Sequence, residues 1–307
     1  MMKCFNYFIL IFSTVTLMEV SSNCTMETYG MYCTNLKTNN ESEILVLDLE
    51  GENNTNVKSV FLRNSSGSIG EDTFSEISQI DSMDIQFCSI KNISTDMKSL
   101  HMLYLINNSE LPNITNTLMK HFPELRILYI SNNHWLIIQN CSFKSSQNLQ
   151  HLTIKGQEIT KLSNNFLEGL IELTYLDLKG NGIEHIDENA FFSIKKLNHL
   201  ILNDNKIKQF EANTFSNLTN LESLDLIGTD LVKLDQQVLR NQHELKYIGL
   251  PSKLLKENLE LKQLTNTFKK LESIGLSYND KNDTDIDKFI ELCRFSGFQI
   301  KFVTNME

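Results

Sequence analysis

The acidic stretch 280–287 has residue types that could bind a metal ion. Its oxygen-bearing side chains are those of Asp280, Asn282, Asp283, Asp285 and Asp287, and calcium takes six to eight oxygen ligands. An EF-hand loop that starts at Asp283 would need Gly at its sixth position and Glu at its twelfth. The sequence has Lys288 and Arg294 there. We therefore expect a capping loop rather than a calcium site, and predict no metal or other cofactor.

Catalytic chemistry has no motif of its own in this chain. HExxH, GxSxG, P-loop and dinucleotide-binding patterns are all missing from the sequence, and each supplies groups that its chemistry requires. Cys88 and Cys141 have no His at a fixed spacing beside them. We therefore predict that the protein is not an enzyme. The net charge of −10 also disfavours nucleic acid as a partner, because phosphate binding needs clustered Lys and Arg.

The positions of the leucines predict the fold. Four blocks of 24 residues follow one another from Leu149, and their apolar residues recur in the order LxxLxLxxNxIxxIxxxxFxxL. The alternation around Leu176 and Leu178 is that of a strand with one buried face. Each unit is too small to bury its apolar face alone, so the units must stack. We count ten repeats, with starts near Val57, Ile80, Leu100, Leu125, Leu149, Leu173, Leu197, Leu221, Leu245 and Leu271.

The ninth position of each repeat is expected to hold the turns together. A chain that turns out of a strand leaves buried backbone N–H and C=O groups, and an Asn carboxamide offers both a donor and an acceptor for them. We predict a ladder of such side chains along the stack. Its members are Asn108, Asn133, Asn181, Asn205 and Asn279, with Ser65, Cys88, Gln157 and Thr229 as variants.

The side chains between the strand leucines are expected on the opposite, solvated face, about 4.8 Å apart from repeat to repeat. They are rich in Tyr, which supplies contact area at a small entropy cost, and so favour a partner-binding surface. An ordinary solvated sheet with stabilising cross-strand pairs is the alternative. A pH-sensitive contact at its histidines is a further possibility, although solvated histidines usually have no such role. The predicted partner-binding residues are Tyr104, Ile127, Tyr129, His151, Thr153, Tyr175, Asp177, His199, Ile201, Asp225 and Tyr247.

Residues 1–22 have the pattern of a secretory signal peptide, with Lys3 before a short apolar run and Val20 and Ser22 before a cleavage site. We therefore expect a secreted, extracellular protein without a membrane span. Asn-x-Ser/Thr sequons agree with this compartment. Sequons predicted to carry glycans lie at Asn40, Asn53, Asn64, Asn92, Asn107, Asn113, Asn140, Asn217 and Asn282. Glycans at Asn64 and Asn107 would screen the N-terminal part of the solvated sheet face described above. Binding is therefore expected to centre on the repeats from Leu125 to Tyr247.

The ends of the stack need covers for their apolar layers. Residues 23–56 are predicted to be an N-terminal cap with a Cys24–Cys33 disulfide and a covering strand at 44–49, residues 57–279 the repeats, and residues 280–307 the C-terminal cap. The C-terminal cap has helix-like spacing from Ile286 to Phe295 and a last strand in GFQIKFV. Five cysteines remain after cleavage, an odd number. A disulfide-linked dimer through Cys141 or Cys293 is therefore a hypothesis.

The repeat pattern, with its cysteine-bearing N-terminal segment and signal peptide, resembles extracellular leucine-rich repeat proteins of animals. The 24-residue type is similar to that of Toll-like receptor ectodomains and of secreted insect leucine-rich immune proteins. The resemblance implies an α/β solenoid, a horseshoe with a parallel β-sheet on its concave face and mostly irregular or 3-10 return segments. It also implies recognition of an extracellular protein or a microbial surface ligand in innate immunity. A matrix or cell-adhesion component and a secreted effector that acts on a host are the alternatives.

Overall fold

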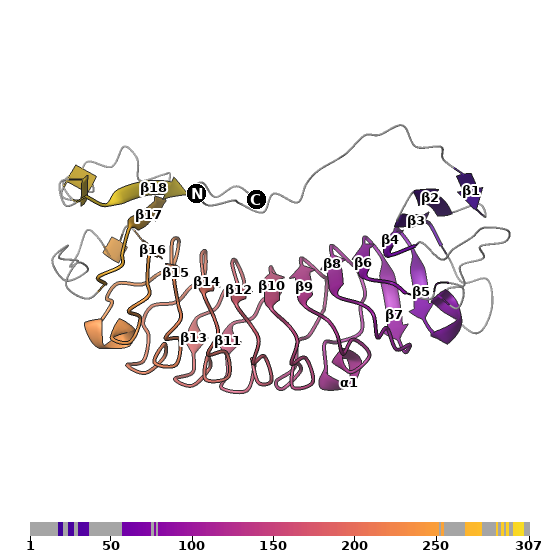
Figure 1. The fold of residues 1–307 in the computed structure, drawn as a ribbon, viewed down its shortest axis with the longest axis horizontal. Coiled ribbons are helices and arrows are strands. Elements are labelled where there is room, and N and C mark those ends of the chain that lie inside the picture. Colours follow the sequence, from indigo (N-terminus) through magenta and orange to yellow (C-terminus); the bar gives the residue numbers. More distant parts are fainter. Residues whose placement is uncertain are drawn as a thin grey trace.

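The computed structural model is a curved solenoid with its strands on the inner side of the arc and its return segments on the outer side (Figure 1). It describes residues 18–20, 24–27, 30–36, 57–74, 77, 79–251, 253–254, 268–277, 287, 290–291, 293–294 and 297–303. Its main sheet has 14 strands. The predicted leucine-rich repeat horseshoe is confirmed.

Ten parallel strands form the body of this sheet, and each begins two residues after a repeat start predicted from the sequence. Neighbouring strands pair in register along the whole row. The ten strands are therefore joined by nine turns of the solenoid. They are β4 (Ser59–Arg63), β6 (Ser82–Gln86), β8 (Met102–Ile106), β9 (Ile127–Ser131), β10 (His151–Lys155), β12 (Tyr175–Asp177), β14 (His199–Ile201), β15 (Ser223–Asp225), β16 (Tyr247–Gly249) and β17 (Ser273–Ser277).

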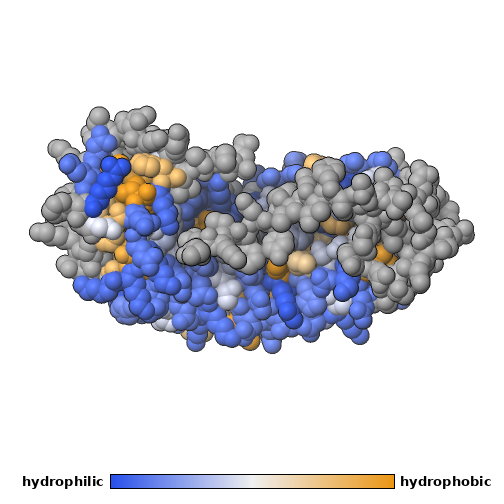
Figure 2. Space-filling view, turned by 45° about the horizontal axis from the view of Figure 1, so that its top comes forward, coloured by the Kyte–Doolittle hydropathy of each residue, from blue (hydrophilic) through white to orange (hydrophobic). Residues whose placement is uncertain are grey.

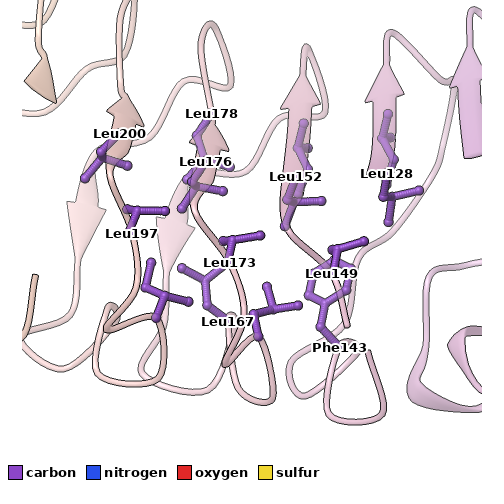
Figure 3. Packing of buried hydrophobic residues seen from close by; sticks show 14 of the residues in the cluster. Leu128, Phe143, Leu149, Leu152, Leu167, Leu173, Leu176, Leu178, Leu197 and Leu200 are labelled. Atoms are coloured by element: carbon purple, nitrogen blue, oxygen red, sulfur yellow. The ribbon is translucent and has the colours of Figure 1, made fainter. Parts of the chain in front are cut away.

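The core is a column of aliphatic side chains that the repeat spacing stacks on one another. Leu128, Leu152, Leu176 and Leu200 are register partners on adjacent strands, and their side chains point into the same layer (Figure 3). All four have no exposed surface. Burying one such side chain contributes about 1.5–3 kcal/mol, so the stack rather than any single repeat supplies the stability.

The return segments contain little regular structure among the described residues. Two short parallel pairs link successive returns: β5 (Ser66–Ile69) with β7 (Ser89–Ile93), and β11 (Lys161–Leu162) with β13 (His185–Ile186). The helical pieces are the 3-10 turns η2 (Glu71–Phe74) and η3 (Gln236–Leu239) and one helix, α1 (Asn116–Met119). Thr115 caps α1 by accepting a hydrogen bond from Leu118 N at 3.1 Å. The expected irregular and 3-10 returns are therefore present.

The predicted Asn ladder runs through the described repeats. Asn108 Oδ1 accepts from Cys88 N at 2.9 Å, and Asn133 Oδ1 accepts from Asn108 N at 3.0 Å. The same carboxamides donate to backbone carbonyls, as in the 2.8 Å bond from Asn133 Nδ2 to Leu105 O. Each of these Asn side chains thus connects two turns of the solenoid. The variant Thr229 does not, because its hydroxyl donates to Leu226 O of its own turn at 2.8 Å. Asn279 lies outside the described residues.

Gln157 interrupts this ladder. Gln157 N donates to Asn181 Oδ1 at 2.9 Å, so the backbone keeps its place in the ladder. Its longer side chain turns back, however, and donates to Lys155 O at 3.1 Å. Its Oε1 atom is buried without a hydrogen-bond partner. The ladder therefore consists of two runs, one on each side of the join between the repeats that start at Leu125 and Leu149.

The N-terminal end carries the predicted disulfide. Cys24 of β2 (Cys24–Glu27) and Cys33 of β3 (Gly30–Thr34) are opposite each other in an antiparallel pair and are bonded. β3 then continues the sheet by pairing parallel with β4. A short strand β1 (Met18–Val20), within the predicted signal peptide, pairs with β2. The covering strand predicted at 44–49 lies outside the described residues.

At the C-terminal end, β18 (Gln299–Val303) pairs parallel with β17 and extends the sheet, as the sequence predicted. Residues 287, 290–291 and 293–294 of the predicted helix are helical. Cys293 and Ile290 pack into the core there. The other residues of the acidic stretch, 280–286, lie outside the described residues.

Candidate functional site

The concave face displays two columns of side chains, as the sequence predicted. The first column runs from Met102 through Ile127, His151, Tyr175, His199 and Ser223 to Tyr247. The second runs from Tyr104 through Tyr129, Thr153, Asp177, Ile201 and Asp225 to Gly249. Every predicted partner-binding residue therefore lies on one sheet face, although no contact with a partner tests that role.

Aromatic rings contact one another along these columns. The Tyr104 and Tyr129 ring centroids are 6.0 Å apart. Tyr175 lies between two histidines, with its centroid 5.7 Å from that of His151 and 6.2 Å from that of His199. Because aromatic pairs favour such offset and tilted arrangements at 4.5–7 Å, the rings hold each other in place before any ligand arrives.

Part of the second column is more buried than the sequence alone indicated. Asp177 is 3% exposed, and Thr153 and Asp225 are also buried. Asp177 is buried because the Lys155 side chain lies beside it, with Lys155 Nζ 2.7 Å from Asp177 Oδ2. The same Nζ is 5.9 Å from the Tyr129 ring centroid. The expectation that all these side chains are freely solvated is thus wrong, because Lys155 at the end of β10 lies over the neighbouring Asp177.

Tyr247 closes the C-terminal end of the face. Its hydroxyl donates to Asp225 Oδ2 at 3.2 Å, and Lys301 Nζ lies 5.6 Å from its ring centroid. The ring fits because Gly275 has no side chain, since a Cβ there would collide with the Tyr247 hydroxyl. Burial and the Asp225 charge raise the pKa of Tyr247, and burial is also the main cause that raises the pKa of Asp225. This pair therefore presents a neutral phenol beside a buried acid whose protonated form burial favours.

The two histidines are poised to remain neutral. Burial lowers the pKa of His151, and the neighbouring His199 lowers it further. Burial is also the main cause that lowers the pKa of His199, partly offset by Glu222. Burial likewise raises the pKa of Tyr175. At neutral pH the centre of the concave face is therefore an uncharged aromatic surface bordered by lysine and aspartate.

The sequence analysis missed the N-terminal continuation of the second column. Phe61 is the register partner of Tyr32 and of Asp84, and its ring stacks on that of Tyr32 at 4.3 Å. Arg63 bonds Asp84 Oδ2 at 2.9 Å and lies 5.9 Å from the Phe61 ring. The repeat spacing could have found Phe61, because it stands at the same position of its repeat as Tyr104 and Tyr129.

The predicted glycosylation sites within the described residues lie at the surface. Asn64, Asn92, Asn107, Asn113 and Asn140 are exposed, and Asn217 is half-buried. Asn64 and Asn107 directly follow β4 and β8 and have positive φ angles. They therefore lie at the edge of the concave face, where the screening prediction needs them. Asn40, Asn53 and Asn282 lie outside the described residues.

The free thiols are in poor positions for bonding between molecules. Cys88 and Cys293 are buried, and burial raises the pKa of Cys293 to about 12. Cys141 is half-buried, and a hydrogen bond to Glu168 is the main cause that raises the pKa of its thiol. The thiolate is the reactive form, so the dimer hypothesis now depends on Cys141.

Neither a metal cluster nor a membrane span is present in the part of the chain that the structure describes. No three His, Cys, Asp or Glu side chains come together there as they would around an ion. No helix there is long and apolar enough to cross a bilayer. Of the acidic residues considered for calcium, only Asp287 is described.

The leucine-rich repeat family model matches residues 123–183 and 171–231. The matched segment is thus built of leucine-rich repeats, and the ten stacked strands and the Asn ladder continue the same repeat fold on both sides of it. The fold of the chain resembles a Toll-like receptor ectodomain: it aligns with the crystal structure of a TLR13–ssRNA13 complex with a TM-score of 0.62 and 19% sequence identity. The alignment covers 82% of this chain and 41% of the TLR13 chain. No curated protein matches the sequence.

Proposed function

We propose that this chain is a secreted, non-enzymatic protein of innate immunity that binds a protein or a microbial surface ligand through its concave face. The aromatic side chains that recur on the concave face from β8 to β16 are the observation that carries the proposal. Tyr104, Tyr129, Tyr175 and Tyr247 offer large, rigid contact areas with polar tips, and tyrosines of this kind dominate binding energies at interfaces.

The charges beside these rings favour a ligand with mixed polarity. Lys155 and Asp177 form an ion pair next to Tyr129, and Lys179 pairs with Asp204 at 3.5 Å. Because Lys155 and Lys179 are already paired with carboxylates, the described part of this face offers no row of free cations of the kind that a phosphate backbone requires. RNA appears in the TLR13 complex, but for this chain a protein or a glycan-bearing surface fits the face better.

Capture of partners by the intact protein tests this proposal. The secreted protein is incubated with extracellular fluid from its source and recovered, and its partners are identified by mass spectrometry. The variants Tyr129→Glu and Tyr175→Glu place a charge in the middle of the aromatic surface and should abolish capture. Phe192→Glu is the matched control, because Phe192 is an exposed aromatic residue on a return segment.

Three results would count against the proposal. Partner recovery that survives both tyrosine substitutions would move the binding site away from the concave face. Recovery of matrix proteins alone would favour a structural role in the extracellular matrix. Equal loss with Phe192→Glu would show that the variants act through misfolding.

A further inference from the structure

Trp135 is turned outward at a position where most of the other described repeats bury an aliphatic residue, Glu110 in the preceding repeat being an exception. It stands two residues after the ladder residue Asn133, and the equivalent Ile183 and Ile207 have no exposed surface. Trp135 is 85% exposed and has a φ of +57°, a rare backbone conformation for a bulky residue. Leu136 is buried in its place. The loop therefore breaks the repeat pattern and exposes the one tryptophan of the chain.

The exposed ring borders a hollow of about 1000 Å³ between two successive loops, 132–140 and 156–161. We call it the Trp135 hollow. Ile137 is 57% exposed beside it, and Leu136 and Phe166 contribute buried apolar surface. Much of the described surface seen in Figure 2 is hydrophilic, so neighbouring exposed apolar residues of this size mark a place for a partner. Both loops begin where β9 and β10 end, which sets the hollow apart from the concave columns.

One buried acceptor and one exposed carboxylate of the hollow lack partners among the described residues. Gln157 is 9% exposed, and its Oε1 atom has no partner. Glu158 is exposed at the next position, and no ion pair of the described residues involves it. The nearby cation, Lys161, is already paired with Asp187 at 3.0 Å. A ligand must therefore bring donors and positive charge, and the face of the indole ring also attracts cations.

We propose that the Trp135 hollow is a second binding site, which takes an extended cationic peptide segment in which Lys or Arg alternates with large apolar residues. The apolar side chains lie against Trp135 and Ile137. A basic side chain pairs with Glu158, which is exposed at the hollow. An extended segment meets both needs together, because its side chains alternate in direction and can place an apolar group on Trp135 and a basic group at Glu158.

Tryptophan fluorescence tests this site directly, because Trp135 is the only tryptophan. The probe is an acetylated, amidated hexapeptide that alternates Lys and Leu, with Glu–Leu and Lys–Ser hexapeptides as controls. All titrations use the full chain carrying Asn140→Gln, so that no glycan at the rim of the hollow interferes. The Lys–Leu peptide should shift the emission to the blue and saturate, and should shield the ring from acrylamide. The Glu–Leu peptide should do neither, and the Lys–Ser peptide should bind at least about tenfold more weakly.

Two charge variants distinguish binding at the Trp135 hollow from a general attraction between the cationic peptide and the acidic protein. Glu158→Lys should weaken binding of the Lys–Leu peptide at least about threefold. Glu211→Lys changes the net charge equally at an exposed acid outside the hollow, and should leave the affinity within about 1.5-fold. Trp135→Ala should abolish the binding heat in calorimetry while leaving the melting temperature unchanged, since the ring is already in solvent.

The proposal is overturned by any of three results. One is the lack of a saturable change up to about 1 mM Lys–Leu peptide, because a weaker dissociation constant would not indicate a specific site. Another is an equal response to the Glu–Leu peptide. The third is full affinity in Trp135→Ala, or an equal loss in Glu158→Lys and Glu211→Lys.

Discussion

Removing the carboxamide of Asn205 should cost more stability than any surface substitution in the repeats. Asn205 is 2% exposed. Its Oδ1 accepts from Asn181 N at 3.1 Å and from Ile183 N at 2.9 Å, and its Nδ2 donates to Leu178 O at 2.9 Å and Leu202 O at 2.8 Å. One side chain thus satisfies groups in two adjacent turns.

The magnitude follows from which of these partners lose their only bond. Leu178 O keeps a second donor, Asn181 Nδ2 at 2.8 Å. Two buried N–H groups and Leu202 O are left unpaired, and each such group costs about 1–3 kcal/mol. Allowing for some relaxation, Asn205→Ala should lower the free energy of unfolding by about 3–5 kcal/mol. Asn205→Leu should cost at least as much, because it leaves no room for a replacing water.

Urea unfolding followed by circular dichroism measures this loss, and thermal melting should show a drop on the order of 10 °C. Asn198→Ala is the control: Asn198 Nδ2 donates to Asn220 O at 3.1 Å at the surface of the same repeat, and its removal should cost less than about 0.5 kcal/mol. If Asn205→Ala and Asn198→Ala unfold at the same urea concentration, the ladder is not what stabilises the turns.

Three further predictions concern other parts of the chain. Gln157→Asn should raise the free energy of unfolding by about 0.5–1.5 kcal/mol, because the shorter carboxamide can rejoin the ladder; an unchanged urea midpoint would contradict this. Burial lowers the pKa of His151 and His199, so below about pH 6.5 the unfolded chain binds protons that the folded chain does not, and stability falls with falling pH. The urea midpoints at pH 7 and about pH 5 should differ less in the double variant His151→Gln/His199→Gln than in the unsubstituted protein. The same difference in both proteins would refute this. Cys141→Ser should remove any disulfide-linked dimer seen on non-reducing gels, whereas a dimer that persists must use another cysteine.

The repeat motif predicted the strands and the ladder because both depend on spacing alone. Leu128, Leu152 and Leu176 lie 24 residues apart, and a parallel sheet with that period must stack them. The same reasoning gave the residues of both concave columns, since strand side chains alternate between faces. It also placed the final strand after Phe298 correctly.

The burial of Asp177 and the turn at Trp135 could not be predicted in this way. The burial of Asp177 depends on Lys155 at the end of a neighbouring strand, a diagonal contact that no linear spacing reveals. At Trp135 the motif expects a buried residue, and the outcome depends on whether a large ring or Leu136 fits the core slot better. That is a question of packing volume, which the pattern of apolar letters does not contain.

The interruption of the ladder at Gln157 has a mechanical consequence. Load passing along the arc is shared by the sheet, the core, the ladder and the return-side bonds, and at this join the ladder side chain makes no contribution. Amide exchange should therefore be faster, and bending easier, between the repeats that start at Leu125 and Leu149 than at Asn181. Because the Trp135 hollow spans the same two loops, a segment bound there would act as a splint and stiffen the arc where the ladder is interrupted.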